Sequence, residues 1–129
     1  MLGKLDNLQV LELLDYAYVG KQMICLEKRF PQLKELVFRC LHSLENWKIE
    51  DEAMPKLRKL VLKQCWKLIM LPRGLGRITS LQKLDVRGMP DYFQSRLRVN
   101  DGEDWDKVRH IPFVYKGGSV PFLQRNSCN

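Results

Sequence analysis

Apolar residues recur along this chain at one fixed spacing, which appears in four separate segments. Each segment places apolar residues at its first, fourth, seventh and ninth positions, and the segments begin at residues 5, 30, 54 and 78. The central leucine of the pattern returns after 25, 24 and 24 residues. A helix with a chance apolar stripe would not keep this register through three returns, so the pattern indicates an internal structural repeat.

The spacing within each repeat predicts one short β-strand. The last two apolar residues of a segment, such as Leu60 and Leu62, are two positions apart and therefore point to the same face of a strand. A repeat of about 20–29 residues with one strand per unit is typical of leucine-rich repeats. The predicted fold class is therefore α/β: a leucine-rich repeat solenoid with a curved parallel sheet, a short helical or irregular convex side, about four repeats and a C-terminal cap.

The repeat also predicts where the elements lie. The strand cores are expected near residues 9–13, 35–39, 59–63 and 83–87. Pro72 and Gly74 favour a short helical turn or loop on the convex side. The apolar residues expected to close the core from that side are Leu44, Trp47, Leu68, Leu71 and Leu75, with Tyr16, Tyr18, Met23, Ile24 and Leu26 in the less regular segment 16–29.

The repeats divide the chain into three parts. Residues 1–88 are predicted to form the leucine-rich repeats, residues 89–115 a C-terminal cap rich in apolar and aromatic residues, and residues 116–129 a flexible tail. No cap precedes the first repeat, so its strand edge would face water. We expect either that the chain is the end of a longer protein or that a partner covers this edge.

Charge is concentrated in the middle of the chain. The 129 residues carry a net charge of +7, and residues 53–100 alone hold 11 basic and 2 acidic residues. No stretch approaches the ~20 apolar residues that span a bilayer, and the first residues do not resemble a secretory signal. These features predict a soluble protein with a basic surface that favours acidic partners.

The strand register predicts which residues share the concave face of the sheet. Arg39, Lys63 and Arg87 are expected to form a basic column, because neighbouring strands lie ~4.8 Å apart. The alternative is that curvature splays these side chains apart as solvated surface residues. The complete predicted partner-binding set on this face adds two flanking lysines and two exposed valines and reads Arg39, Lys59, Lys63, Lys83, Arg87, Val37 and Val61.

Residues that could support catalysis or metal binding form no informative pattern. His42 and His110 have no nucleophile or carboxylate at a telling spacing, and Cys40 and Cys65 fall near the ends of strands, where a structural role is expected. The acidic run at residues 101–106 lacks the ligand order of a calcium loop and is interpreted as solvated. We therefore expect no enzyme activity, no cofactor and no metal site.

Three segments together resemble the C-terminal end of plant intracellular disease-resistance proteins. The segments are LVFRCLHSLENW, LRKLVLKQCWKLIMLPRGLGRITSLQKLDV and GEDWDKVRHIPFV; the most telling features are the Cys65, Leu68, Leu71, Pro72 run and the closing DKVRHIP. The resemblance implies a cytoplasmic immune receptor with a nucleotide-binding switch domain. Its repeat region would bind a pathogen effector, a guarded host protein or the switch domain itself, and would hold the switch off.

The resemblance has one clear departure, and other functions stay open. No GxxxxGK[ST] phosphate loop occurs in these residues, so a nucleotide switch would have to lie upstream or be absent. One alternative is a stand-alone adaptor or decoy from a truncated receptor gene. A weaker alternative is a polyanion or nucleic-acid binder, since the basic block lacks interleaved aromatic residues and any nucleic-acid motif.

Overall fold

The computed structural model describes residues 7–14, 20–25 and 30–117. In these residues, short strands and turns alternate, and helices are few and short. The elements in chain order are β1 (Val10–Leu14), β2 (Gln22–Cys25), β3 (Glu35–Arg39), β4 (Asn46–Ile49), β5 (Lys59–Lys63), the 3-10 helix η2 (Arg73–Arg77), β6 (Lys83–Arg87), α1 (Asp91–Ser95), α2 (Trp105–Val108) and β7 (Phe113–Lys116).

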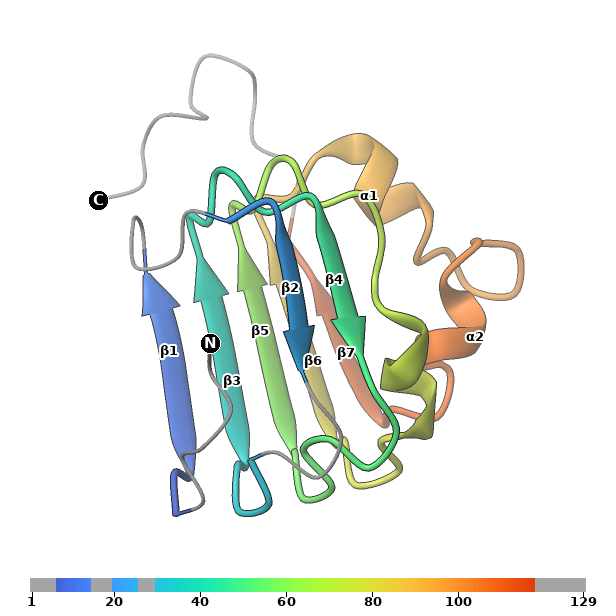
Figure 1. Ribbon diagram of the computed structural model, residues 1–129. Helices are drawn as coiled ribbons and strands as arrows, with labels where there is room; N and C mark the ends of the chain where they lie inside the picture. The colour runs from blue at the N-terminus through green and yellow to red at the C-terminus, as the bar shows by residue number, and fades with distance from the viewer. Residues whose placement is uncertain (1–6, 15–19, 26–29, 118–129) are drawn as a thin grey trace.

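Five parallel strands form the main sheet, in the order β1-β3-β5-β6-β7 (Figure 1). Strands β3, β5 and β6 occupy the ranges that the repeat predicts, and β1 begins and ends one residue later than expected. The strands pair in register, with Leu36 beside Leu60 and Leu60 beside Leu84. The predicted α/β leucine-rich repeat architecture is therefore confirmed.

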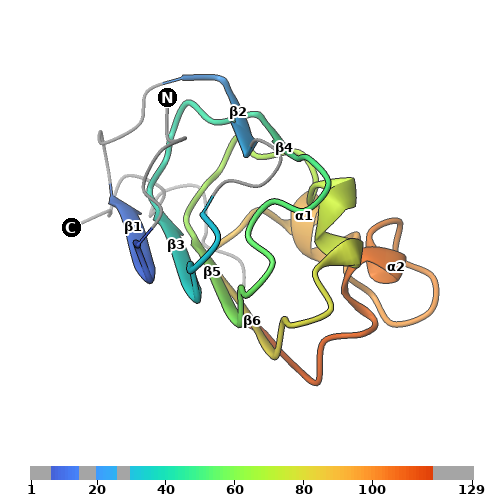
Figure 2. The same ribbon diagram turned by 60° about the horizontal axis from the view of Figure 1, so that its bottom comes forward.

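The opposite side of the core holds a second, smaller sheet that the sequence analysis did not predict. Strands β2 and β4 pair in parallel, so the first two repeats contain two strands each (Figure 2). In the third repeat, Pro72 stands 24 residues after Lys48 of β4. Proline has no N–H to donate to β4, so a third strand of this small sheet is disfavoured here. The chain instead forms η2 directly after Pro72, which confirms the predicted short helical turn.

Leucines from both sides of the molecule fill one continuous core. The inward residues of the main sheet are 0–2% exposed at Leu36, Leu60 and Leu84. Facing them are the five predicted convex-side residues, all buried: Leu44, Trp47, Leu68, Leu71 and Leu75. Met23 is buried as predicted, but Ile24 is 49% exposed because it alternates with Met23 and Cys25 along β2. Tyr16, Tyr18 and Leu26 lie outside the described residues.

The C-terminal segment closes the array and also lengthens the sheet. Phe93 and Ile111 are buried in the same core cluster as the leucines of the repeats, whereas Phe113 is exposed. Strand β7 pairs in parallel with β6, so part of the expected cap is a fifth strand. The tail predicted from residue 116 is therefore wrong at Lys116, which is the last residue of β7. Residues 118–129 of that tail lie outside the described residues.

Strands β3, β5 and β6 are each followed by a residue with left-handed backbone geometry. The φ angles are 59° at Cys40, 54° at Gln64 and 62° at Gly88, each immediately after its strand. This shared bend turns the chain from the sheet toward the convex side. Cys65 lies one position further along its repeat than Cys40, and its side chain is buried in the core.

Across the described segments of the chain, no helix has the length and apolar character needed to cross a membrane.

Candidate functional site

The solvent side of the five-stranded sheet, which we call the concave face, carries the first, third and fifth residues of each full repeat strand. Strand pairing places Arg39 beside Lys63 and Lys63 beside Arg87. It likewise places Lys59 beside Lys83. The columns that the repeat predicts therefore exist as neighbours in the sheet. Their role in binding a partner stays a prediction.

Val61 departs from the predicted surface. It was expected to be exposed, but only 6% of it is accessible, whereas Val37 is half-buried. Val61 lies in the central strand of the sheet, with Val37 and Asp85 directly beside it in register. Lysines two positions before and after it on the same face also have long aliphatic stems that cover apolar surface. The prediction of an exposed apolar centre at Val61 is therefore wrong.

An ion pair within the concave face modifies the basic column. The Nε of Arg87 donates a hydrogen bond to Oδ1 of Asp85 at 2.8 Å. The Asp85 side chain is 8% exposed and that of Arg87 is 60% exposed, so the carboxylate is largely covered and the guanidinium extends into solvent. Arg87 is thus already partly neutralised. The alternation of Asp85 and Arg87 on one face could have suggested this pair from the sequence.

The concave face encloses a shallow hollow of about 390 Å³. Its walls include the seven predicted residues together with four that carry three carboxylates and one apolar side chain: Glu12, Glu35, Asp85 and Leu14. Long flexible side chains line this hollow, which suits contact with another macromolecule more than enclosure of a small molecule. Among the residues that the structure describes, no group of three or more His, Cys, Asp or Glu could hold a metal ion.

Both histidines make packing contacts. Nε2 of His110 lies 3.0 Å from the carbonyl oxygen of Ile78 and joins the C-terminal segment to the start of the fourth repeat. The ring of His42 stacks on Trp66, with 4.7 Å between the centroids and 16° between the planes. These contacts explain both residues as parts of the fold. The absence of enzyme activity stays an expectation.

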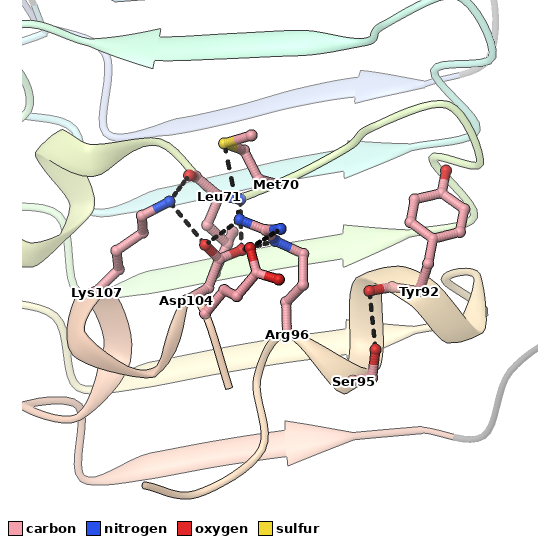
Figure 3. A network of polar contacts seen from close by, with 8 residues as sticks. Met70, Leu71, Tyr92, Ser95, Arg96, Asp104 and Lys107 are labelled. Carbon is pink, nitrogen blue, oxygen red and sulfur yellow. Dashed lines mark hydrogen bonds and ion pairs between the residues drawn. The ribbon is translucent and has the colours of Figure 1, made fainter. Parts of the chain in front are cut away.

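A buried carboxylate fastens the C-terminal segment to the convex side, and the sequence analysis missed it. The run at residues 101–106 was interpreted as solvated, but Asp104 is 0% exposed. Its oxygens accept hydrogen bonds from Arg96 and Lys107, and from the N–H of Leu71 at 3.1 Å (Figure 3). Lys107 also donates to the carbonyl oxygen of Leu71 at 2.7 Å. The interpretation as a solvated run is therefore wrong for Asp104, whose partners Leu71, Arg96 and Lys107 all lie outside residues 101–106.

Comparison with known proteins identifies relatives across most of the chain. Over 114 residues, which are 88% of the chain, it is 41% identical to Disease resistance RPP8-like protein 3 and 42% identical to Disease resistance protein RPH8A, both from Arabidopsis thaliana. It is also 41% identical over the same length to Disease susceptibility protein LOV1 from that plant. No protein-family model and no solved structure matches the chain.

These relatives are much longer than the chain, which spans about 12% of their length. Because the match covers 114 of the 129 residues, it includes most of the repeats and most of the C-terminal segment that closes them. This agrees with the resemblance inferred from the repeat and its closing motif. Over 88% of its length, the chain is therefore a homologue of one segment of the plant disease resistance proteins.

Proposed function

We propose that this chain is a protein-recognition region of a plant immune receptor and acts in the defence response to pathogens. The observation that carries the proposal is its 41% identity, over 114 residues, to Disease resistance RPP8-like protein 3. The chain would act in the cytoplasm by binding rather than by catalysis, and without a cofactor. Its partner would be a pathogen effector, a guarded host protein or the receptor's own nucleotide-binding domain.

The concave face is the proposed contact surface. Arg39, Lys63 and Arg87 lie side by side in three neighbouring strands, and the side chain of Arg87 is 60% exposed. Like charges at this spacing repel, so an acidic partner surface would relieve a cost that the free chain carries. Lys59 and Lys83 add two more cations at the other end of the same strands. An acidic surface on the effector, the host protein or the receptor itself fits this face.

A chimaeric receptor tests the proposal. The matching segment of RPP8-like protein 3 would be replaced by this chain, and the chimaera expressed in leaves with and without pathogen challenge. We expect regulated cell death: a silent receptor at rest and a response on challenge. A second chimaera with Lys63→Glu and Arg87→Glu should lose the response or become active at rest, because either contact would be broken.

The matched control carries the same change in charge at two positions that do not line the concave face. Lys48 and Lys67 are exposed residues of β4 and of the loop after Cys65, so Lys48→Glu with Lys67→Glu alters net charge but not the concave face. This control should behave like the unsubstituted chimaera. A concave-face double variant that also behaved like the unsubstituted chimaera would refute the proposed contact.

A further inference from the structure

Strand β7 adds an aromatic column to the concave face. Phe113 and Tyr115 are 58% and 50% exposed, and they pair in register with Lys83 and Asp85 of β6. Their alternation along the strand places both rings on the same side of the sheet as those two residues. Exposed aromatic side chains with few torsions are common anchors of protein interfaces. From the sequence, both residues are predicted to belong to the cap at residues 89–115.

The aromatic column and the basic columns are continuous. The Nζ of Lys83 lies 5.1 Å from the ring centroid of Tyr115, within the range of a cation–π contact. On its other side, Lys83 is in register with Lys59 of β5. One row of residues therefore runs across four strands as acid, base, base and aromatic: Glu35, Lys59, Lys83 and Phe113.

The charges on this face favour one end of that row for an anion. The described residues form one ion pair on the concave face, between Asp85 and Arg87. Within the same described part of the chain, no ion pair engages Lys59 or Lys83. Glu12 and Glu35 lie toward β1 and would repel a ligand carboxylate placed there. An acidic ligand is therefore directed toward β5, β6 and β7.

We propose that the concave face binds an acidic protein segment that carries an aromatic or aliphatic anchor. Its carboxylates lie over Lys59 and Lys83, and its anchor packs on Phe113 and Tyr115. This proposal rests on the proposed function, since it names the chemistry of the partner at the same face. The residues that set specificity would then include two aromatic side chains outside the regular repeats.

The sheet sets the spacing of the two features in the partner. Lys59 and Phe113 are separated by two strand-to-strand steps, which is ~10 Å. An extended segment that crosses the strands advances ~3.3 Å per residue. The acidic residue and the anchor are therefore expected about three positions apart.

The same face disfavours a nucleic acid. Aromatic rings beside lysines can stack on bases, but a nucleic-acid chain carries a phosphate at every nucleotide. Three carboxylates share this face, at Glu12, Glu35 and Asp85, and Asp85 already pairs with Arg87. A polynucleotide crossing the sheet would meet these carboxylates, whereas a short acidic segment placed over β5–β7 avoids two of them.

Fluorescence anisotropy with the full 129-residue chain tests the inference. The probes are labelled peptides that contain EEGGF, EEGGA or QQGGF, and an RNA of eight uridines. We expect EEGGF to bind most tightly and each of the other peptides to bind at least about fivefold more weakly, equivalent to ~1 kcal/mol per lost feature. RNA that binds more tightly than EEGGF, or equal binding of the three peptides, would overturn the inference.

Variants of the chain locate the contact. Phe113→Ala with Tyr115→Ala should remove the advantage of EEGGF over EEGGA, and Lys59→Gln with Lys83→Gln should remove its advantage over QQGGF. The matched controls are Val99→Ala, at a residue that is 59% exposed away from the sheet, and Lys48→Gln with Lys67→Gln. Both controls should leave all affinities unchanged, and unchanged urea midpoints show that each variant is folded.

The peptide and receptor experiments fail independently. If no peptide binds but reversal of Lys63 and Arg87 still disables the chimaera, the proposed function stands and the inferred partner chemistry is wrong. If EEGGF binds as expected but the chimaera ignores the reversal, the partner chemistry stands and the proposed role in the receptor is wrong.

Discussion

The guanidinium of Arg96 donates hydrogen bonds to both carboxylate oxygens of Asp104, with Nε 3.1 Å from Oδ2 and Nη2 3.1 Å from Oδ1. The Asp104 side chain is completely buried, and the Arg96 side chain is 19% exposed. The Nζ of Lys107 lies 2.7 Å from Oδ1 of the same carboxylate. A buried carboxylate with this many donors is favourable only while all partners are present. The network therefore ties the C-terminal segment to the repeat beneath it.

Removal of the Asp104 carboxylate should destabilise the fold strongly. Asp104→Ala leaves Lys107 and Arg96 as largely buried cations, with the exposed Glu103 as the remaining carboxylate partner of Arg96, and should cost about 3 kcal/mol in the free energy of unfolding. Urea unfolding followed by tryptophan fluorescence measures the loss. The control is Asp106→Ala, because Asp106 is 88% exposed and should change stability by less than about 0.5 kcal/mol. Equal effects of the two substitutions would contradict the assigned role of Asp104.

The same network predicts a dependence of stability on pH. Burial alone would raise the pKa of Asp104, but hydrogen bonds from Arg96, Lys107 and the Leu71 N–H together outweigh it and hold the pKa below its ordinary value. Folding is therefore favoured by this group above the pKa of the unfolded chain, about 3.9, and the contribution is lost as pH falls through the lower folded pKa.

The measurement is the difference in urea midpoint between the wild type and Asp104→Asn. We expect a large difference at pH 7 that narrows below about pH 4, where the carboxyl takes up its proton first in the unfolded chain and then, at lower pH, in the folded protein. Asp106→Asn, measured in parallel, should show a small difference throughout. A wild-type advantage that grew as the pH fell would show that the sign is wrong.

Two glycines in one helical turn should respond differently to the same substitution. A Cβ at Gly74 of η2 would lie 2.3 Å from the carbonyl oxygen of Ile49 in β4, whereas the nearest atom to a Cβ at Gly76 is 3.6 Å away. Gly74→Ala must push the turn away from β4 and should cost about 1–3 kcal/mol. Gly76→Ala should change the free energy of unfolding by less than about 0.5 kcal/mol. Thermal unfolding of both variants makes the comparison, and a Gly74→Ala protein as stable as wild type would exclude this close approach.

Cys65 should be protected from alkylation in the folded protein. Burial raises the pKa of its thiol from the ordinary 9.0 to about 11, and the thiol donates a hydrogen bond to the carbonyl oxygen of Lys63 at 3.5 Å. At pH 8 this leaves about 100-fold less thiolate, and burial also hinders access. Iodoacetamide labelling followed by mass spectrometry should show slow modification of Cys65, and fast modification after unfolding in urea. Rapid labelling in the folded state would contradict the burial of this thiol.

The regular part of the fold was predictable because one residue type at one spacing determines it. Leu36, Leu60 and Leu84 are 24 residues apart, and this alone indicated three strands and their register. The signal weakened where the period broke. Strand β7 follows a longer connection, so its Phe113 and Tyr115 were assigned to the cap. The β2–β4 pair was missed because Met23 and Trp47 fit an irregular apolar cover equally well.

The candidate site was predictable in position but not in exposure. The spacing placed Arg39, Lys63 and Arg87 in adjacent strands, which pairing alone determines. Burial depends on neighbouring side chains, and Val61 is covered because its strand is central and lysines flank it. The partners of Asp104 could not be inferred from the acidic run, because Arg96 and Leu71 lie 8 and 33 residues away in the sequence and come close only in the folded chain.

The in-register pairing of β3, β5 and β6 has a consequence for how such a chain can evolve. Equivalent residues are 24 positions apart, so duplication or loss of one whole 24-residue unit leaves every remaining strand in register with its neighbour. Loss of a single residue within a strand would instead turn its inward leucines outward. Recombination between repeats can therefore widen or narrow the array by ~4.8 Å at a time and exchange one column of surface residues for another. Such a lineage could change the molecules it meets while its interior is preserved.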